Sequence, residues 1–414
     1  MLATFIGIVI VGFILDLVLS YLDIQSWKNE LPAEAESLFT TDEYQKALRY
    51  ARANYNFGLV TGIFSFTAML ALLISGLTGK IFDACLALSN NEWYATLMFA
   101  AVMGITADLL NTPFQLYNTF VIEQKFGFNQ STLLTFFADK CKGYLLAAVL
   151  GGLVLSAFYF FYAATGSFFW LYCWMAVTVF SLLMMMFYTS WILPLFNKIT
   201  PLGDGTLRKS ITSYCDKVGF TLNNVFVMDG SKRSSKANAF FSGFGARKKI
   251  VLFDTLIEQQ TEEELVAVLA HEVGHNKKKH TTTFFIASVF QTGLMLFILS
   301  FFINREEISI ALGSSQHHFA LGLIGFFILY EPVSLLTGVF TSYFSRKHEY
   351  EADAFAASTY NGELLISALK KLTSKTLSNP FPHPLVVALT FSHPTLMQRI
   401  AAIRSIKACR QKGD

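Results

Sequence analysis

Cysteines and charged residues are scarce in this chain, and each scarcity excludes certain classes of protein. The 414 residues include only five cysteines, which are scattered and form no C-x-x-C pair. This pattern predicts neither a disulfide framework nor a thiolate metal site. Charged residues make up 15% of the chain, below the share of a soluble domain. The net charge of +3 is too small to favour nucleic acid as a partner.

Apolar residues fill the chain instead. They make up 53% of it, with 42 phenylalanines, and the mean hydropathy is +0.45, which predicts an α-helical integral membrane protein. Stretches that approach or exceed the roughly 20 apolar residues needed to cross a bilayer predict seven transmembrane helices, at 2–22, 57–79, 93–118, 143–163, 168–193, 281–303 and 319–344. The first stretch lacks a basic start and carries Asp16, so we expect a retained span rather than a cleaved signal.

The basic residues are sorted by loop. All 32 lysines and arginines except Lys80 and Arg305 fall in loops 23–56, 119–142 and 194–280 or in the tail after the last span. Because cytoplasmic loops of membrane proteins are rich in lysine and arginine, these segments are predicted to face the cytosol and the N-terminus to face the other side. We expect a five-span N-terminal region, 1–193, and a second domain, 194–414, that includes the spans 281–303 and 319–344.

The residues from His271 to His275 form an H-E-x-x-H motif. On an α-helix these two histidines lie on one face, where both imidazoles bind a single Zn²⁺ and Glu272 reaches a water on the metal. The start of the helix is also encoded, because Thr261 and Glu264 form a capping-box pattern ahead of an apolar stripe. The motif therefore predicts a zinc peptidase helix.

A third metal ligand is expected, since a catalytic zinc uses three protein ligands and a water. A second predicted helix, 345–354, carries Glu349 and Asp353 four residues apart. They share a face, so one carboxylate binds the metal while the other braces a ligand or handles a proton. His348 is rotated by about 100° from Glu349 on a helix and is expected to be structural. Glu351 lies off that face and is expected to be a solvated charge.

Residues 194–280 form the one sizeable polar segment. Within it, 225–228 and 250–253 are predicted strands, and 238–241 is a candidate third strand. An exposed strand edge beside a zinc ion holds an extended peptide through backbone pairing, without demanding a particular sequence. At such an edge, Asn238 would hydrogen-bond the substrate backbone. The alternative is that Asn238 is a turn residue, which its residue type alone favours.

Both ligand-bearing helices lie close to predicted spans. Glu349 follows Phe344 by five residues, or about 8 Å of helix. If the zinc helix runs on through 277–279 into the span at Thr281, His275 lies roughly 10–15 Å from the apolar region. This arrangement suits cleavage beside a lipid anchor or a membrane segment.

Several motifs together resemble a known family. H-E-x-x-H followed by a helix with E-x-x-x-D-A resembles the gluzincin metalloproteases of membranes. Further stretches are similar to the type I zinc-dependent CaaX prenyl proteases: LYNTFVIE at 116–123, GFNQ at 127–130, GSKRSS at 230–235, NA at 238–239, IVLFDTL at 250–256 and SHP at 392–394. One departure is that the long charged insert of animal members before the zinc helix is absent, since residues 258–260 run straight into Thr261.

The resemblance implies a cytosol-facing, gluzincin-like α+β zinc peptidase domain over 194–414. Its one zinc ion is implied to bind His271, His275 and Glu349, with Glu272 as the general base.

The same resemblance implies roles for four further residues. Asp353 matches an acidic residue that braces a ligand or donates a proton. Asn238 and His393 match groups that hold the substrate backbone and stabilise the transition state, and Arg399 matches an arginine that supports them. By residue type alone, His383 would be as good a candidate as His393.

Three functions compete at this point. The first is a membrane zinc endopeptidase that removes the C-terminal tripeptide from prenylated CaaX proteins, in the endoplasmic reticulum membrane of a eukaryote. The second is a quality-control protease for membrane proteins, which suits the inner membrane of a bacterium. The third is a transporter or scaffold with a structural zinc. This function is disfavoured, because a structural zinc site gives Glu272 no role and would be expected to have a fourth protein ligand.

A few ionisable residues remain outside the motifs. Asp16, Asp108 and Glu331 lie within predicted spans, where a charge requires water or a partner. The resemblance implies that the helices enclose a large water-filled chamber, and these acids are expected either to line it or to hydrogen-bond another helix. His280, which is off the face of His275, and the opposite-side residues 317 and 318 are not expected to touch the metal.

Overall fold

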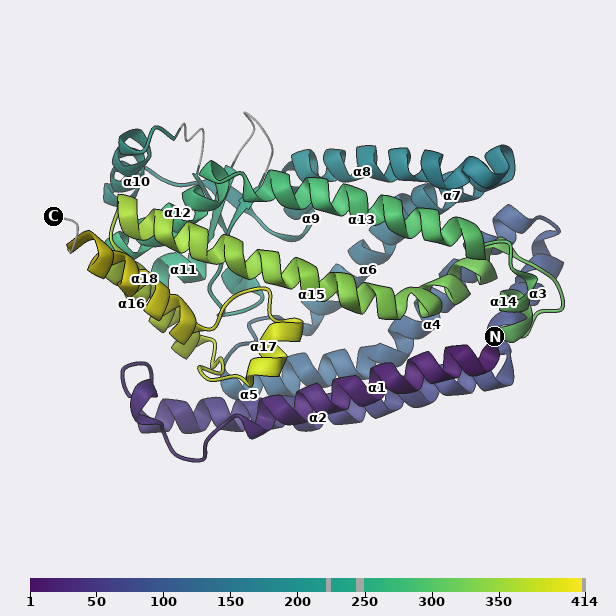
Figure 1. Ribbon diagram of the computed structural model, residues 1–414, viewed down its shortest axis with the longest axis horizontal. Helices are drawn as coiled ribbons and strands as arrows, with labels where there is room; N and C mark the ends of the chain where they lie inside the picture. The colour runs from purple at the N-terminus through teal and green to yellow at the C-terminus, as the bar shows by residue number, and fades with distance from the viewer. Residues whose placement is uncertain (221–224, 243–248, 412–414) are drawn as a thin grey trace.

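The computed structural model describes residues 1–220, 225–242 and 249–411 and is mostly helical (Figure 1). The helices before residue 200 are α1 (Leu2–Gln25), α2 (Thr41–Ser75), α3 (Leu77–Ser89), α4 (Glu92–Tyr117), α5 (Gln124–Phe126), α6 (Leu133–Leu146), α7 (Gly152–Thr165), α8 (Phe169–Trp191) and α9 (Leu193–Phe196). The later helices are α10 (Thr206–Lys217), α11 (Asp254–Gln259), α12 (Glu262–Lys277), α13 (His280–Phe302), α14 (Glu306–Ala311), α15 (Phe319–Thr359), α16 (Gly362–Lys375), α17 (Pro384–Thr390) and α18 (Leu396–Gln411). Short 3₁₀ or π turns join some of them: η1 (Ala33–Ala35), η2 (Asn118–Glu123), η3 (Ala147–Gly151), η4 (Gly166–Phe168) and η5 (Gly230–Lys232).

The long helices account for the apolar composition. Within the described residues, 6 helical stretches are long and apolar enough to cross a membrane: Leu2–Gln25, Thr41–Ser75, Glu92–Phe126, Leu133–Phe196, His280–Phe302 and Phe319–Thr359. The stretch Leu133–Phe196 contains two of the seven predicted spans. The chain turns within it at Gly166, whose φ of +54° lies in the region that favours glycine. As a result α8 packs back against α7 and α13.

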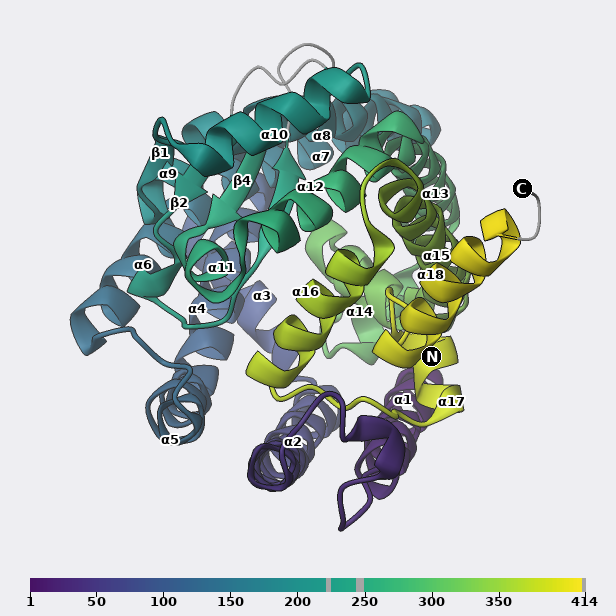
Figure 2. The ribbon, with the colours of Figure 1, turned by 90° about the vertical axis from the view of Figure 1, so that its left-hand side faces the viewer.

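The long helices run roughly side by side, and the polar elements gather at one end (Figure 1). That end carries α10, α12, α16, α18 and the C-terminus, whereas α3, α14 and the N-terminus lie at the other (Figure 1). Viewed from the polar end, α1 and α2 lie across the molecule from α7 and α8 (Figure 2).

A small sheet lies at the polar end. Its strands β1 (Ile199–Pro201), β2 (Val225–Met228), β3 (Ala239–Ser242) and β4 (Lys249–Phe253) follow the order β1-β2-β4-β3. The β2–β4 pair is parallel and the other two pairs are antiparallel. The three predicted strands are confirmed, with shifts of one residue for the last two. Strand β1 was not predicted, because three residues ending in proline carry no alternating pattern.

The helix α12 lies in the largest apolar cluster. Its residues from Glu264 to Ala270 are all buried, and it packs against α10, α15 and α16. At Gly274, a side-chain Cβ would lie 3.1 Å from the backbone of Ala352 on α15. Glycine therefore permits the close approach of the two helices that carry the H-E-x-x-H and E-x-x-x-D motifs.

The continuity of these two helices differs. Helix α15 runs unbroken from Phe319 through Glu349 to Thr359, so the predicted link between Glu349 and a span is confirmed. Helix α12 does not run straight on into the next span. It ends at Lys277, and Lys279 adopts a left-handed conformation with φ of +60° before α13 begins.

The acidic residues within the apolar helices have different surroundings. Asp108 on α4 accepts hydrogen bonds from Lys140, at 2.7 Å, and from Tyr144, both on α6. For Asp108, the prediction of helix-to-helix hydrogen bonding is therefore confirmed. Glu331 lies against Gly12 of α1, one turn before Asp16. A chamber-facing position for Asp16 and Glu331 stays a prediction.

Candidate metal centre

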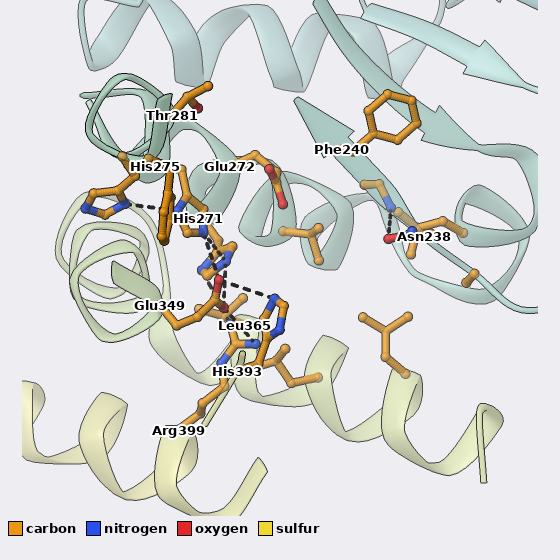
Figure 3. Close-up of a pocket in the computed structure, with 18 of the residues that line it drawn as sticks. Asn238, Phe240, His271, Glu272, His275, Thr281, Glu349, Leu365, His393 and Arg399 are labelled. Atoms are coloured by element: carbon orange, nitrogen blue, oxygen red, sulfur yellow. Dashed lines mark hydrogen bonds and ion pairs between the residues drawn. The ribbon is translucent and has the colours of Figure 1, made fainter. Parts of the chain in front are cut away.

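Three potential metal ligands converge where α12 meets α15. The Nε2 atoms of His271 and His275 lie 3.1 Å apart. Glu349 Oε1 lies 3.2 Å from His275 Nε2, and Glu349 Oε2 lies 3.5 Å from His271 Nε2. One ligand atom from each residue falls within 4.8 Å of the others. Figure 3 shows the three side chains pointing toward one another.

These distances fit a divalent metal ion. A tetrahedral zinc with Zn–N bonds of about 2.0–2.1 Å separates two imidazole nitrogens by about 3.3 Å, close to the 3.1 Å seen here. Glu349 Oε2 is buried and has no hydrogen-bond partner among the described residues. Arg399 Nη1 lies 3.4 Å from this oxygen. Because a buried carboxylate oxygen that accepts no hydrogen bond is costly, the atom is suited to bind a further cation.

The backbone that presents the two histidines is defined locally. The Thr261 hydroxyl accepts a hydrogen bond from the Glu264 N–H, and the Glu264 carboxylate accepts one from the Thr261 N–H. The predicted capping box is therefore confirmed. Glu264 also accepts hydrogen bonds from Ser367 and Lys371 on α16. These contacts attach the start of α12 to its neighbour and fix where the histidines fall.

His271 is held by a buried ion pair. Its Nδ1 lies 2.9 Å from Asp353 Oδ1, and Arg399 donates to both oxygens of Asp353 at 2.6 and 2.8 Å. Asp353 is completely buried. Because Asp353 is ion-paired with Arg399, His271 donates from Nδ1 and leaves its Nε2 lone pair free for a metal.

Protonation competes with metal at this histidine. Burial disfavours the imidazolium, but hydrogen bonds to Asp353 and Glu349 outweigh burial and raise the pKa of His271 to about 9. Burial lowers the pKa of the Arg399 guanidinium, yet its bonds to Asp353 raise it overall. A metal at this site would bind the neutral imidazole, in competition with a proton.

Glu272 faces the cavity rather than the ion pair. It lies between the metal-binding group and Asn238 (Figure 3), and its side chain is only partly exposed. Burial raises the pKa of Glu272 above its usual range, although the nearby His271 and His275 act in the opposite direction. A carboxylate made more basic in this way is a better proton acceptor at neutral pH.

A cavity of about 700 Å³ opens beside these side chains. Its lining includes Asn238 and Phe240 from the β3 edge, Glu272, and Phe284 from α13. Strand β3 pairs with β4 on one side only among the described strands. The cavity therefore lies beside the metal-binding group and is lined by apolar side chains and by a β3 edge that is free of partners among the described strands.

Asn238 is exposed on this wall. Its Oδ1 accepts a hydrogen bond from the Ala239 N–H at 2.8 Å, and its backbone carbonyl accepts one from Phe253. The turn-like contact to Ala239 and the position at the strand edge are thus both present.

The structure separates the two candidate histidines of the C-terminal region. His393 Nε2 lies 3.5 Å from Glu349 Oε1, and the His393 side chain is 63% exposed. His383 instead caps α17 by accepting a hydrogen bond from the Leu385 N–H. Residues 317 and 318 flank the start of α15, at the end of the molecule opposite the site.

Sequence reasoning missed two residues near the site. His280 Nδ1 lies 2.9 Å from His275 Nδ1, and Glu351 Oε2 lies 3.0 Å from His280 Nε2. Glu351 was predicted to be a solvated charge, but its carboxylate is hydrogen-bonded to His280. His348 is buried and stacks on His280, as expected of a structural residue. Helical periodicity carried no signal for these contacts, because they depend on the break at Lys279.

The membrane-type fold and the metal-binding group together define the class of the protein. A mostly helical protein of the membrane type, whose H-E-x-x-H helix meets a glutamate of a second helix, is a membrane metallopeptidase. The comparisons with known proteins agree. Residues 20–198 match the family described as "CAAX prenyl protease N-terminal, five membrane helices", and residues 201–407 match peptidase family M48. The chain belongs to family M48, among the CAAX prenyl proteases.

The similarity extends over nearly the whole chain. The CAAX prenyl protease 1 homolog of Arabidopsis thaliana is 34% identical over 412 residues, which cover 97% of this chain and 96% of the relative. CAAX prenyl protease 1 of Saccharomyces cerevisiae is 33% identical, with 91% and 89% covered. The crystal structure of S. mikatae Ste24p superposes with a TM-score of 0.92 at 32% identity, covering 97% of this chain and 98% of that one. The resemblance drawn from the motifs is confirmed.

Proposed function

We propose that this protein is a zinc endopeptidase that removes the C-terminal tripeptide from prenylated CaaX proteins. One observation carries the proposal: His271, His275 and Glu349 converge beside Glu272, on the wall of a cavity that a free strand edge also lines. The relatives named CAAX prenyl proteases support the substrate class.

The chemistry assigns separate tasks to the residues. His271, His275 and Glu349 would hold the zinc ion, which would supply an acidified water and a Lewis acid for the scissile carbonyl. Glu272 accepts the proton of the attacking water and passes it to the leaving amine. His393, exposed at the cavity, donates a hydrogen bond to the developing oxyanion.

Asp353 and Arg399 support a metal ligand and do not contact the substrate in this mechanism. Of the two proton carriers considered, Glu272 and Asp353, only Glu272 lines the cavity. Asp353 is completely buried and its oxygens are occupied by His271 and Arg399. We therefore assign Asp353 to orienting His271, and Arg399 to holding Asp353 in place.

The substrate peptide binds as an added strand. Backbone groups of β3 on the cavity side pair with an extended peptide, and the Asn238 amide donates to a peptide carbonyl. Phe284 and Phe285, at the start of α13, line the same cavity. These apolar side chains lie where a membrane helix begins, which suits a substrate anchored by a lipid.

The proposal includes a topology. Seven spans place the termini on opposite sides, in accord with their positions at opposite ends of the molecule (Figure 1). The distribution of lysine and arginine puts the metal site on the cytosolic side. Residues 1–193 form a five-span region and residues 194–414 the zinc protease domain, in the endoplasmic reticulum membrane of a eukaryote or the inner membrane of a bacterium.

A broader quality-control protease is the second candidate. The free β3 edge supports it, because backbone pairing imposes little sequence preference. A structural zinc in a transporter or scaffold fits less well, since Glu272 contributes no ligand and lies on the cavity.

A paired peptide assay separates these functions. We expect the purified protein to cleave a farnesylated CaaX peptide at least ten times more efficiently than the same peptide without the lipid, measured as kcat/KM. A chelator should abolish cleavage, and added Zn²⁺ should restore it, because the metal supplies the reactive water. Equal cleavage of both peptides would favour the quality-control function. Cleavage that persists without bound metal would contradict a metallopeptidase.

A further inference from the structure

A chain of hydrogen bonds leads away from one metal ligand. His275 Nδ1 lies 2.9 Å from His280 Nδ1, and His280 Nε2 lies 3.0 Å from Glu351 Oε2. His280 is buried and the Glu351 side chain is 38% exposed. The two contacts use both ring nitrogens of His280, so this histidine links a ligand on α12 to a carboxylate on α15.

The link depends on the helix break after α12. On a continuous helix, a residue five positions after His275 is rotated by about 140° from it and points elsewhere. Here α12 ends at Lys277 and Lys279 takes a left-handed conformation, so that His280 turns back over His275. A left-handed non-glycine residue is strained, and at Lys279 this strain accompanies the contact between the two histidines.

The direction of each hydrogen bond follows from its end groups. An ionised Glu351 carboxylate only accepts, so His280 donates from Nε2. Neutral His280 then carries a bare lone pair on Nδ1 and accepts the N–H of His275 Nδ1. This leaves the Nε2 lone pair of His275 free, on the side where His271 and Glu349 converge.

We propose that His280 and Glu351 are positioning residues, which hold His275 in the tautomer and orientation that the metal requires. The inference rests on the metal site of the proposed function and adds residues to its support. The two ligand histidines are then braced alike: His271 directly by Asp353, and His275 through His280 by Glu351. Partners of this kind strengthen metal binding about 10–100-fold.

His348 offers a matched control. Its ring stacks on His280, with centroids 4.0 Å apart and planes inclined by 8°, but its Nδ1 has no hydrogen-bond partner among the described residues. A phenylalanine at this position keeps the stacking and leaves the three-residue chain intact. A phenylalanine at His280 keeps the stacking as well but removes both hydrogen bonds.

The test measures metal binding rather than turnover. The metal-free full-length protein, purified in detergent, is titrated with Co²⁺ against a competing chelator, and its visible spectrum is recorded. We expect His280→Phe to weaken Co²⁺ binding by about 10–100-fold and to alter the d–d absorption. His280→Asn should recover part of the affinity, since its amide oxygen accepts from His275 Nδ1–H. His348→Phe should stay within about twofold of the unmodified protein.

Other results would overturn the proposal. Unchanged affinity and spectrum in His280→Phe would remove His280 from any positioning role, and an equal loss in His348→Phe would assign the effect to packing. If His280→Phe does not fold, Glu351→Ala replaces it as the test variant. A loss of Co²⁺ affinity of about 3–10-fold in Glu351→Ala supports the chain of hydrogen bonds, and unchanged Co²⁺ affinity contradicts it. An unmodified protein that binds no Co²⁺ would refute the metal site itself.

Discussion

Replacing Glu272 with glutamine is expected to lower peptide cleavage by about 10²–10⁴-fold, the usual contribution of a general base. Glutamine has nearly the same shape but cannot accept the proton of the attacking water. Glu272 does not belong to the group of three metal ligands, so Glu272→Gln should retain one bound zinc per chain. The measurements are kcat on a farnesylated CaaX peptide and the zinc content of the same preparation.

The control for this experiment lies on the same helix. Glu263 is exposed in the first turn of α12 and away from the cavity, so Glu263→Gln should leave both cleavage and zinc content unchanged. Cleavage by Glu272→Gln within tenfold of the unmodified protein would exclude Glu272 as the base. Loss of zinc from this variant would instead show that Glu272 supports the metal.

Replacing Arg399 with methionine is expected to destabilise the protein by about 3–5 kcal/mol, because it leaves a buried carboxylate without its partner. Arg399 donates to both oxygens of the completely buried Asp353, and its Nη1 lies 3.4 Å from Glu349 Oε2. The effect is measured as a lower free energy of unfolding of the metal-free protein in detergent. Metal affinity should fall as well, since Asp353 orients His271.

A second arginine on α18 provides the comparison. Arg404 lies 4.0 Å from Glu363 and both side chains are at least half exposed, so Arg404→Met should cost at most about 1 kcal/mol. Adding Asp353→Asn to Arg399→Met should restore part of the stability, because the buried residue 353 then carries no charge that requires the arginine. Equal, small losses in Arg399→Met and Arg404→Met would contradict a stabilising buried ion pair.

The local parts of the site were predictable from the sequence. The capping box at Thr261 and the spacing of His271 and His275 are written within one helix, where a period of 3.6 residues determines which side chains share a face. The same reasoning placed Glu349 and Asp353 on one face of α15. The strands at 225–228 and 250–253 were also found, because β-branched and aromatic residues cluster there.

The contacts between distant segments were not predictable in this way. The pairing of His280 with Glu351 requires the turn at Lys279, for which the run of lysines gives no signal. The bonds from Lys140 and Tyr144 to Asp108 join helices whose relative rotation is set by packing. Residue type alone ranked His393 and His383 equally, and only the family resemblance favoured His393. The folded chain places His393 Nε2 3.5 Å from Glu349 Oε1.

The position of the site explains why such a protein belongs in a membrane. Glu349 lies on the same unbroken helix as the apolar stretch that starts at Phe319, and α13 begins at the cavity wall. A metal ligand and part of the cavity wall therefore lie on helices that are long and apolar enough to cross a membrane. A peptidase for free soluble peptides would gain nothing from this arrangement.

The most direct test of the account is X-ray absorption at the zinc edge of the purified, active protein. We predict one zinc per chain, bound by two imidazole nitrogens and by oxygen ligands at about 2.0–2.1 Å, with the imidazole signal lost in a His271→Ala, His275→Ala double variant. Active protein without zinc, or a zinc bound through sulfur at about 2.3 Å, would contradict the account.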